Sequence, residues 1–181
     1  MASAHAHQRS RLTKQERLQR GIDGEEEFVR WLNSCERRFV RVDQSIETFA
    51  KLFAKEVKRP DFLVLLDSIG LIAVDVKNQA PQQDGCYTLS KDDELTKTLA
   101  FERRFRIPLW YAYFDRTSRS ARWLWISALR AWEVGLTGRN REQGVEYLRI
   151  EPSQFAVLET LDDFGKLLSH GSSATTILES G

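Results

Sequence analysis

Three ionisable side chains interrupt an apolar stretch, and their types and spacing are suited to holding a metal ion. The stretch runs from Pro60 to Gln79 and carries Asp61, Asp75 and Lys77. Two carboxylates brought close together repel one another unless a cation lies between them or one of them is protonated. A hard divalent cation such as Mg²⁺, bound through carboxylate oxygens and water, is the natural occupant of such a pair.

A β-hairpin is the element that would bring the two carboxylates together. Two apolar runs rich in β-branched residues flank residues 67–70, Asp-Ser-Ile-Gly, which contain three turn formers. With the turn centred in this segment, Asp61 lies opposite Asp75 or Val76. Cross-strand neighbours have Cβ atoms roughly 5 Å apart.

Lys77 and Gln79 continue the face of Asp75, because side chains alternate along a strand. Gln79 is open to two interpretations, since it either lines the same cleft or is an ordinary loop amide. The simplest alternative for the whole pattern is a solvated ion pair at the edge of a sheet. Against it, residues 71–76 are too apolar for a solvated edge, and a buried unpaired carboxylate is costly.

The motif resembles the signature of a known family. Pro60-Asp61, thirteen intervening residues and Asp75-Val76-Lys77 are similar to the pattern of the PD-(D/E)XK nuclease superfamily, which includes restriction endonucleases and Holliday junction resolvases. The segment 21–28 also resembles the first helix of that family, which carries a further acidic residue. The resemblance covers residues 14–115, and the rest of the chain is unmatched.

This resemblance implies an endonuclease that hydrolyses DNA phosphodiester bonds with Mg²⁺ or Mn²⁺. Asp61 and Asp75 would bind the metal, with the Val76 carbonyl as a further ligand. Lys77 would orient or deprotonate the attacking water and offset developing negative charge, while Glu25 would complete the metal shell or hold a second ion. The implied fold is α/β, with a central mixed β-sheet flanked by helices in a restriction-endonuclease-like core.

Helix geometry selects Glu25 from three adjacent glutamates at positions 25–27. At roughly 100° per residue, the centre of the apolar stripe on the expected first helix falls almost at Glu25, with Glu26 a quarter turn away and Glu27 on the opposite side. This assignment holds only if the helix continues through Gly21 and Gly24. The two glycines indicate either that the helix lies close to another element or that it is broken there. The stripe consists of Leu18, Ile22, Phe28, Val29 and Leu32.

The sequence Asp75-Val76-Lys77 is a triplet of an acidic residue, any residue and lysine, and a second such triplet occurs at Glu56-Val57-Lys58. The triplet alone is therefore weak evidence for a nuclease motif. About one such triplet is expected by chance in a chain of this length. This one lies in a polar stretch with no strand pattern. Residues 44–59 as a whole are either a short amphipathic helix with a solvated basic face or a loop that touches phosphate.

Periodicity and turn residues predict the remaining elements. The arginines of the loop 115–120 either grip a nucleic-acid backbone or are simply solvated, and the aromatic strands are core rather than base-stacking platforms. The first predicted helix begins at Thr13, and further helices are predicted at 91–106, 128–134 and 153–168. Strands are predicted at 39–42, 86–89, 109–114, 122–126 and 145–150. Residues 135–143 are predicted to be a flexible loop.

The length of 181 residues suits one domain, or one domain with a small extension. We expect a nuclease-like domain at residues 13–169, between disordered tails at 1–12 and 170–181. The formal net charge is +1, so any contact with nucleic acid must come from local basic patches.

Several protein classes are excluded by composition. All three histidines lie near the chain ends, which argues against a Ser–His nucleophile, an HNH-type nuclease or a His-ligated zinc site. The two cysteines form no CxxC pattern, as is typical of a reduced cytoplasm. The sequence shows neither a run of about 18 apolar residues that could span a membrane nor a secretory signal, so a cytoplasmic location is expected.

Two other functional classes remain as alternatives. One is a catalytically inactive nuclease fold that binds nucleic acid or a protein partner, and the other is a subunit whose ion pairs are only structural. The intact Asp61, Asp75 and Lys77 argue against the first. DNA as the partner follows from the resemblance alone. The oligomeric state is open, with a homodimer as one expectation because enzymes that cut both strands are often dimers.

Overall fold

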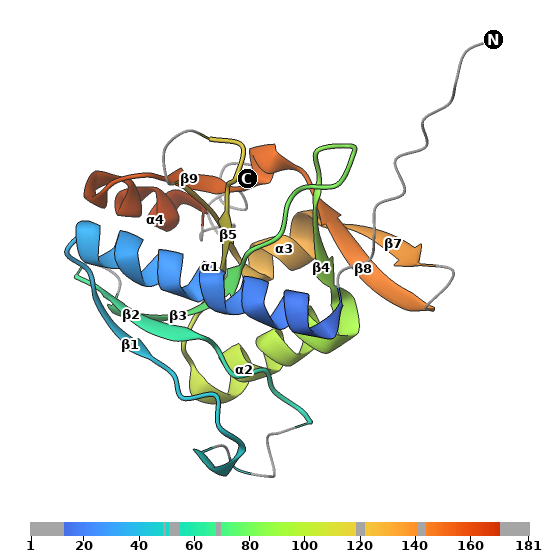
Figure 1. Ribbon diagram of the computed structural model, residues 1–181, viewed down its shortest axis with the longest axis horizontal. Helices are drawn as coiled ribbons and strands as arrows, with labels where there is room; N and C mark the ends of the chain where they lie inside the picture. The colour runs from blue at the N-terminus through green and yellow to red at the C-terminus, as the bar shows by residue number, and fades with distance from the viewer. Residues whose placement is uncertain are drawn as a thin grey trace, which may run out of the picture.

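A six-stranded mixed sheet forms the centre of the structure, a computed structural model that describes residues 13–48, 50, 55–67, 70–118, 122–140 and 144–170. The strand order is β1-β2-β3-β5-β6-β9, in which β3 and β5 are parallel and all other neighbours are antiparallel (Figure 1). The α/β class with a mixed sheet is therefore confirmed. The strands are β1 (Arg38–Arg41), β2 (Phe62–Leu66), β3 (Gly70–Lys77), β5 (Leu109–Phe114), β6 (Trp123–Ser127) and β9 (Ala156–Leu158).

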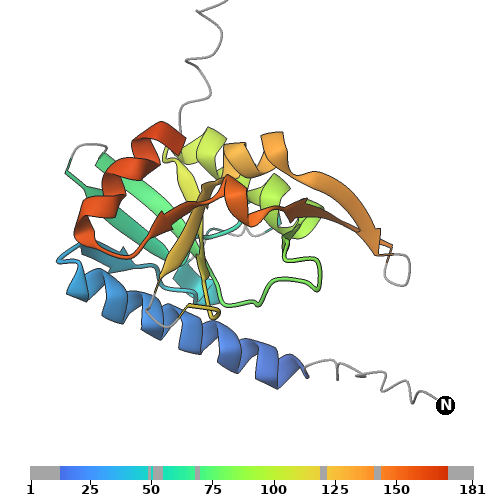
Figure 2. The ribbon, with the colours of Figure 1, turned by 90° about the horizontal axis from the view of Figure 1, so that it is seen from above.

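Helices cover both faces of this sheet. The long helix α1 runs along one side, and α2 and α3 lie on the opposite side (Figure 2). Among the described helices, none is both long and apolar enough to cross a membrane. The helices are α1 (Lys14–Ser34), α2 (Lys97–Phe105), α3 (Ala128–Val134) and α4 (Lys166–His170), with 3₁₀ turns η1 (Ile46–Thr48), η3 (Pro152–Gln154) and η4 (Leu161–Gly165) and a π-helical turn η2 (Lys91–Thr96).

A second, three-stranded sheet lies beside the central one. Its order is β4 (Tyr87–Ser90), β8 (Val145–Ile150) and β7 (Leu136–Asn140), with both pairs antiparallel. The buried apolar side chains form two hydrophobic cores. In one core, Phe28 of α1 packs against buried tryptophans of β6. In the other core, buried tyrosines of β5 pack against the second sheet and α2. The aromatic strands are thus core, as predicted.

The β2–β3 hairpin has the predicted register. Phe62 pairs with Val74 and Leu66 pairs with Gly70; residues 68 and 69 of the turn lie outside the described residues. Continued by one residue, this register sets Asp61 opposite Asp75. Because β3 pairs with both β2 and β5, the motif lies in the middle of the sheet rather than at its edge.

Helix α1 is continuous through both glycines, as the assignment of Glu25 requires. A Cβ atom on Gly24 would lie 2.6 Å from the Cβ of Asn78, so glycine allows the helix to approach the segment after β3. The predicted stripe is only partly buried, since Phe28 is fully buried whereas Leu18 is 67% exposed. The first turns of α1 therefore extend beyond the core.

Two predictions for the C-terminal third were wrong. Residues 153–168 form no single helix: η3, β9, η4 and the start of α4 share this segment, because residues 156–158 extend the central sheet beside β6. Residues 136–140 of the predicted loop form β7, where a Cβ on Gly138 would lie 2.7 Å from the ring of Tyr147. A glycine that signalled flexibility in the sequence instead allows close packing.

Other predictions are confirmed in part, or concern residues that the structure does not describe. The predicted helix at 91–106 is present as η2 and α2. Of the segment 44–59, residues 46–48 form one 3₁₀ turn, whereas positions 49 and 51–54 are not described. Both predicted tails lie outside the described residues, apart from position 170, which belongs to α4.

Candidate active site

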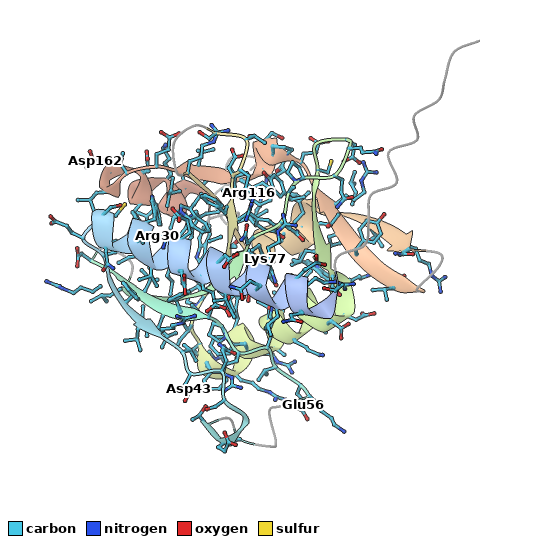
Figure 3. The ribbon with its side chains drawn as sticks, in the orientation of Figure 1. Arg30, Asp43, Glu56, Lys77, Arg116 and Asp162 are labelled. Atoms are coloured by element: carbon cyan, nitrogen blue, oxygen red, sulfur yellow. The ribbon has the colours of Figure 1, made fainter. Side chains whose placement is uncertain are left out.

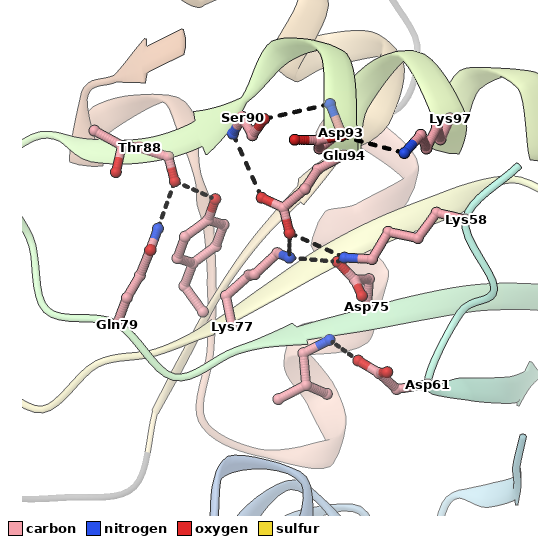
Figure 4. Close-up of polar contacts among 12 residues, drawn as sticks. Lys58, Asp61, Asp75, Lys77, Gln79, Thr88, Ser90, Asp93, Glu94 and Lys97 are labelled. Carbon is pink, nitrogen blue, oxygen red and sulfur yellow. Dashed lines mark hydrogen bonds and ion pairs between the residues drawn. The ribbon is translucent and has the colours of Figure 1, made fainter. Parts of the chain in front are cut away.

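Asp61 stands where the strands of the β2–β3 hairpin begin to diverge. Its backbone N–H donates to the Val74 carbonyl at 3.0 Å, which anchors the residue just before β2. Its carboxylate Oδ2 accepts a hydrogen bond of 2.7 Å from the backbone N–H of Val76 (Figure 4). A single neutral donor therefore holds this carboxylate among the described residues.

Asp75 and Lys77 lie in a compact group of alternating charges on the α2 side of the sheet. The Oδ2 atom of Asp75 lies 2.9 Å from the Nζ of Lys58 and 2.8 Å from the Nζ of Lys77. Both ammonium groups also contact Oε1 of Glu94, with Lys58 at 3.0 Å. These four residues are called the lysine–carboxylate cluster below (Figure 4).

Charge pairing within the cluster outweighs burial. The Asp75 side chain is only 3% exposed, and burial alone would favour its neutral form. The positive charges of Lys58 and Lys77 nevertheless hold the pKa of Asp75 well below its ordinary value. Burial likewise opposes the charge of Lys77, but Asp75 and Glu94 raise the pKa of Lys77 above its ordinary value. All four groups are therefore ionised at neutral pH, and their charges cancel.

Asp61 has the opposite electrostatic environment. Burial and the nearby negative charge of Asp75 raise the pKa of Asp61 well above its ordinary value, and Glu25 adds to the increase. The hydrogen bond from Val76 and the charge of Lys58 oppose the shift without cancelling it. An ionised Asp61 thus lacks sufficient positive charge nearby, which is the condition that a bound cation would satisfy.

Glu25 is the most buried of the three adjacent glutamates. Its side chain is 19% exposed, compared with 29% for Glu27, and Glu26 is exposed. The carboxylate of Glu25 forms an ion pair of 2.5 Å with Arg41 of β1, whereas Glu27 pairs with Arg30 at the surface. Glu25 is the least exposed of the three, as predicted, but the predicted helix phase was wrong for its neighbours, because Glu27, placed on the opposite side of the helix, is half-buried whereas Glu26 is exposed. The role of Glu25 as a ligand stays a prediction.

Gln79 lines a cleft that leads to the cluster. The cleft has a volume of about 800 Å³ and lies between the end of β3 and the second sheet; Glu94, Thr88 and Tyr147 also line it. The side-chain amide of Gln79 donates to the Thr88 carbonyl. Gln79 therefore lines this cleft together with Glu94 while its amide bonds the backbone as a loop amide would, and its role in the site stays a prediction.

Two residues of the cluster, Lys58 and Glu94, were not predicted from the sequence. Lys58 belongs to the triplet that carried no strand pattern, and it reaches Asp75 because the segment before β2 passes beside β3. Glu94 is the third of three consecutive acidic residues, and only the π-helical turn η2 decides which of them faces the lysines. Its other oxygen accepts from the Ser90 N–H at 3.4 Å. The serine at position 90, a helix N-cap residue, was the one local signal.

The carboxylates do not form a ready-made metal site. Among the described residues, no three His, Cys, Asp or Glu side chains are grouped so that they could hold a metal ion. The reason is visible in their contacts, since Asp75 faces two lysines and Asp61 faces the Val76 N–H. The donor type still fits a hard divalent cation, because Asp61 is a carboxylate whose negative charge is poorly compensated and is opposed by the charges of Asp75 and Glu25.

Comparison with known proteins gave no independent assignment. No protein-family model matches the chain, and no curated protein is significantly similar to it.

Proposed function

We propose that the protein is a metal-dependent endonuclease that hydrolyses phosphodiester bonds of DNA. The observation that carries the proposal is the arrangement of Asp61 opposite Asp75, with Lys77 two residues further on, at the diverging end of the β2–β3 hairpin. The likeness of this motif to the PD-(D/E)XK superfamily supports the reaction class and supplies DNA as the substrate.

The metal would be Mg²⁺ or Mn²⁺, held by Asp61, Asp75, the Val76 carbonyl and Glu25. Bound there, such an ion stabilises negative charge on the phosphate and lowers the pKa of a water ligand. Asp61 would ionise on binding, because the cation supplies the charge that its surroundings lack. Asp75 would turn at least partly away from the lysines.

Lys77 acts as a cation rather than as a base in this proposal. Its pKa is raised by Asp75 and Glu94 against the effect of burial, so at neutral pH it holds its proton. An ammonium group can position the attacking water through hydrogen bonds and offset negative charge as it develops on the phosphate. Glu94 would keep the ammonium group in position when Asp75 turns towards the metal, and Gln79 borders the cleft through which DNA would approach.

The primary test is cleavage of supercoiled and linear DNA in Mg²⁺, with and without a chelator. Chelation should abolish cleavage, and Lys77→Met should lower the rate on the order of 10²-fold or more, as expected for loss of a charge-stabilising group. Lys77→Met leaves Asp75 paired with Lys58, so the fold should persist. Glu26→Gln is the matched control and should cleave normally. Full activity of Lys77→Met would refute the proposal.

The metal position can be tested separately. Crystals soaked in Mn²⁺ should show anomalous density between Asp61 and Asp75, and Asp61→Asn should bind Mn²⁺ more weakly. Ca²⁺ should bind but support little cleavage, because its longer bonds and looser geometry position the water poorly. Tight DNA binding by the wild-type protein without cleavage in either Mg²⁺ or Mn²⁺ would instead favour an inactive binding module.

A further inference from the structure

Two arginines from distant parts of the chain meet beside the candidate active site. Asn78, the residue after β3, links them: its Nδ2 donates to the backbone carbonyl of Arg20 at 2.7 Å, and its Oδ1 accepts from Nε of Arg116 at 2.9 Å. Arg20 belongs to α1 and Arg116 to the loop after β5. The close approach of α1 at Gly24 brings the helix to this point. Figure 3 labels Arg116 and Lys77 close together in that view.

The location is one where ligands bind in sheets of this kind. β3 and β5 are parallel, with Lys77 beside Tyr113, so Asn78 and Arg116 both lie just beyond the carboxyl ends of these strands. Ligands of open α/β sheets bind outside these ends. Because side chains alternate along an extended chain, Asn78 faces the α1 side of the sheet while its neighbour Lys77 faces the cluster.

No carboxylate neutralises the two guanidinium groups among the described residues. The neutral amide of Asn78 bonds the guanidinium of Arg116 and the backbone carbonyl of Arg20, and Nε of Arg20 is buried without a hydrogen-bond partner in the described part of the chain. Burial lowers the pKa of Arg20 from its ordinary value, and the like charge of Arg116 adds to the shift. Two adjacent cations with unused donors form a site for an anion.

We propose that Arg20 and Arg116 together bind a backbone phosphate of the nucleic-acid substrate, next to the phosphate that is cut. This inference rests on the proposed function for the identity of the ligand. Guanidinium groups suit the task because their planar donors match phosphate oxygens in pairs. Asn78 holds Arg116 in place, and it connects this phosphate contact to Lys77 through a single peptide unit.

The test is the salt dependence of DNA binding, measured by fluorescence anisotropy of a labelled duplex in a chelator so that nothing is cut. Loss of one phosphate contact should reduce the slope of log Kobs against log[salt] by about 1. We expect this reduction for Arg116→Gln and for Arg20→Gln. The Arg20 carbonyl that holds Asn78 belongs to the backbone and is kept in the second variant. Arg30→Gln, on the same helix but paired with Glu27 at the surface, is the control and should leave the slope unchanged.

A double variant distinguishes one shared phosphate from two separate contacts. If both arginines hold the same phosphate, the double variant should lose no more slope than either single variant, whereas a loss of about 2 would mean two phosphates. A slope that is unchanged in Arg116→Gln, in a wild-type protein that binds and cleaves DNA, would overturn this inference alone. Altered slopes without cleavage would preserve it and refute the nuclease, and a wild-type protein that binds no DNA would overturn both.

Discussion

The two carboxylates of the motif stand opposite one another in register, yet they lie in contrasting surroundings. Asp75 lies between two ammonium groups, which hold its pKa below the ordinary value despite its burial. Asp61 has one backbone N–H as its partner, and burial and the repulsion of Asp75 raise its pKa. The same residue type therefore stabilises the fold at one position and destabilises it at the other.

The difference indicates that Asp61 lacks a neighbouring cation, whereas Asp75 already has two. In the structure, Lys58 and Lys77 provide the positive charge that a metal would otherwise bring to Asp75. Burial and the negative charges of Asp75 and Glu25 instead act against an ionised Asp61, for which positive charge is scarce. A metal would therefore gain most from Asp61 and would have to compete with Lys58 for Asp75.

The largest effect on stability should come from Asp75→Ala. The change leaves Lys58 and Lys77 with Glu94 as their remaining partner in the cluster, and breaking a buried ion pair in this way costs about 3–5 kcal/mol. Urea unfolding should show the loss. Asp93→Ala removes a carboxylate of the same turn whose ion pair with Lys97 is exposed, so it should cost less than about 1 kcal/mol. Equal stability of the two variants would mean that the cluster is not the stabilising half of the pair.

The Glu25→Gln variant tests whether Glu25 binds the metal together with Asp61. If Glu25 contributes to the metal site, its loss should reduce the cleavage rate by about tenfold or more, whereas Glu26→Gln and Glu27→Gln should retain activity. One cleavage assay with all three variants at matched concentrations measures this. An inactive Glu26→Gln would show that the helix phase is irrelevant to the site, and three active variants would remove α1 from the metal shell.

Most of the fold up to β6 follows from local signals in the sequence. Asp67 and Gly70 bound a turn between apolar runs, and this fixes the hairpin register because a shift by one residue would expose the buried face. The C-terminal third lacked such signals. Residues 156–158 are too few for a strand pattern, and they form one only because β6 offers an unpaired edge.

The site was predictable only in part, for the same reason. Alternation along β3 placed Asp75 and Lys77 on one face, and helix phase placed Glu25 inward. Lys58 contacts Asp75 and Glu94 contacts Lys77, each across 17 residues of chain. Apart from the N-cap serine at position 90, no local pattern indicates these contacts, so the sequence indicated the candidate site residues but not the two residues that balance their charges.

Asp61→Asn should stabilise the protein in the absence of metal by about 1 kcal/mol, within the range usual for stabilising substitutions. The amide oxygen can still accept from the Val76 N–H, and the costly buried charge is gone. The pH dependence follows from the raised pKa. Below about pH 4 both folded and unfolded wild type are protonated at this position, and as the pH rises the unfolded state ionises first, which destabilises the folded state.

Thermal unfolding in a chelator between acidic and neutral pH measures this effect. The advantage of Asp61→Asn should be absent at the acid end and grow as the pH rises towards the raised pKa of Asp61. Asp43→Asn serves as a control with the opposite shift, because its pKa is lowered by hydrogen bonds from Ser45. A destabilised Asp61→Asn at neutral pH would show that Asp61 is not the electrostatically deficient half of the comparison.

The smallest predicted effect is that of Lys58→Met, a variant that distinguishes the role of Lys58 from that of Lys77. The cluster has two positive and two negative charges, so Lys58→Met leaves it with a net charge of −1. Removing the ammonium that lies 2.9 Å from Asp75 frees that carboxylate for a metal, and Mn²⁺ affinity measured by calorimetry should rise several-fold while cleavage persists. Lys97→Met, which removes an exposed charge paired with Asp93, should leave the affinity unchanged. If Lys58→Met binds metal more weakly and no longer cleaves DNA, then Lys58, rather than Lys77, is the catalytic cation.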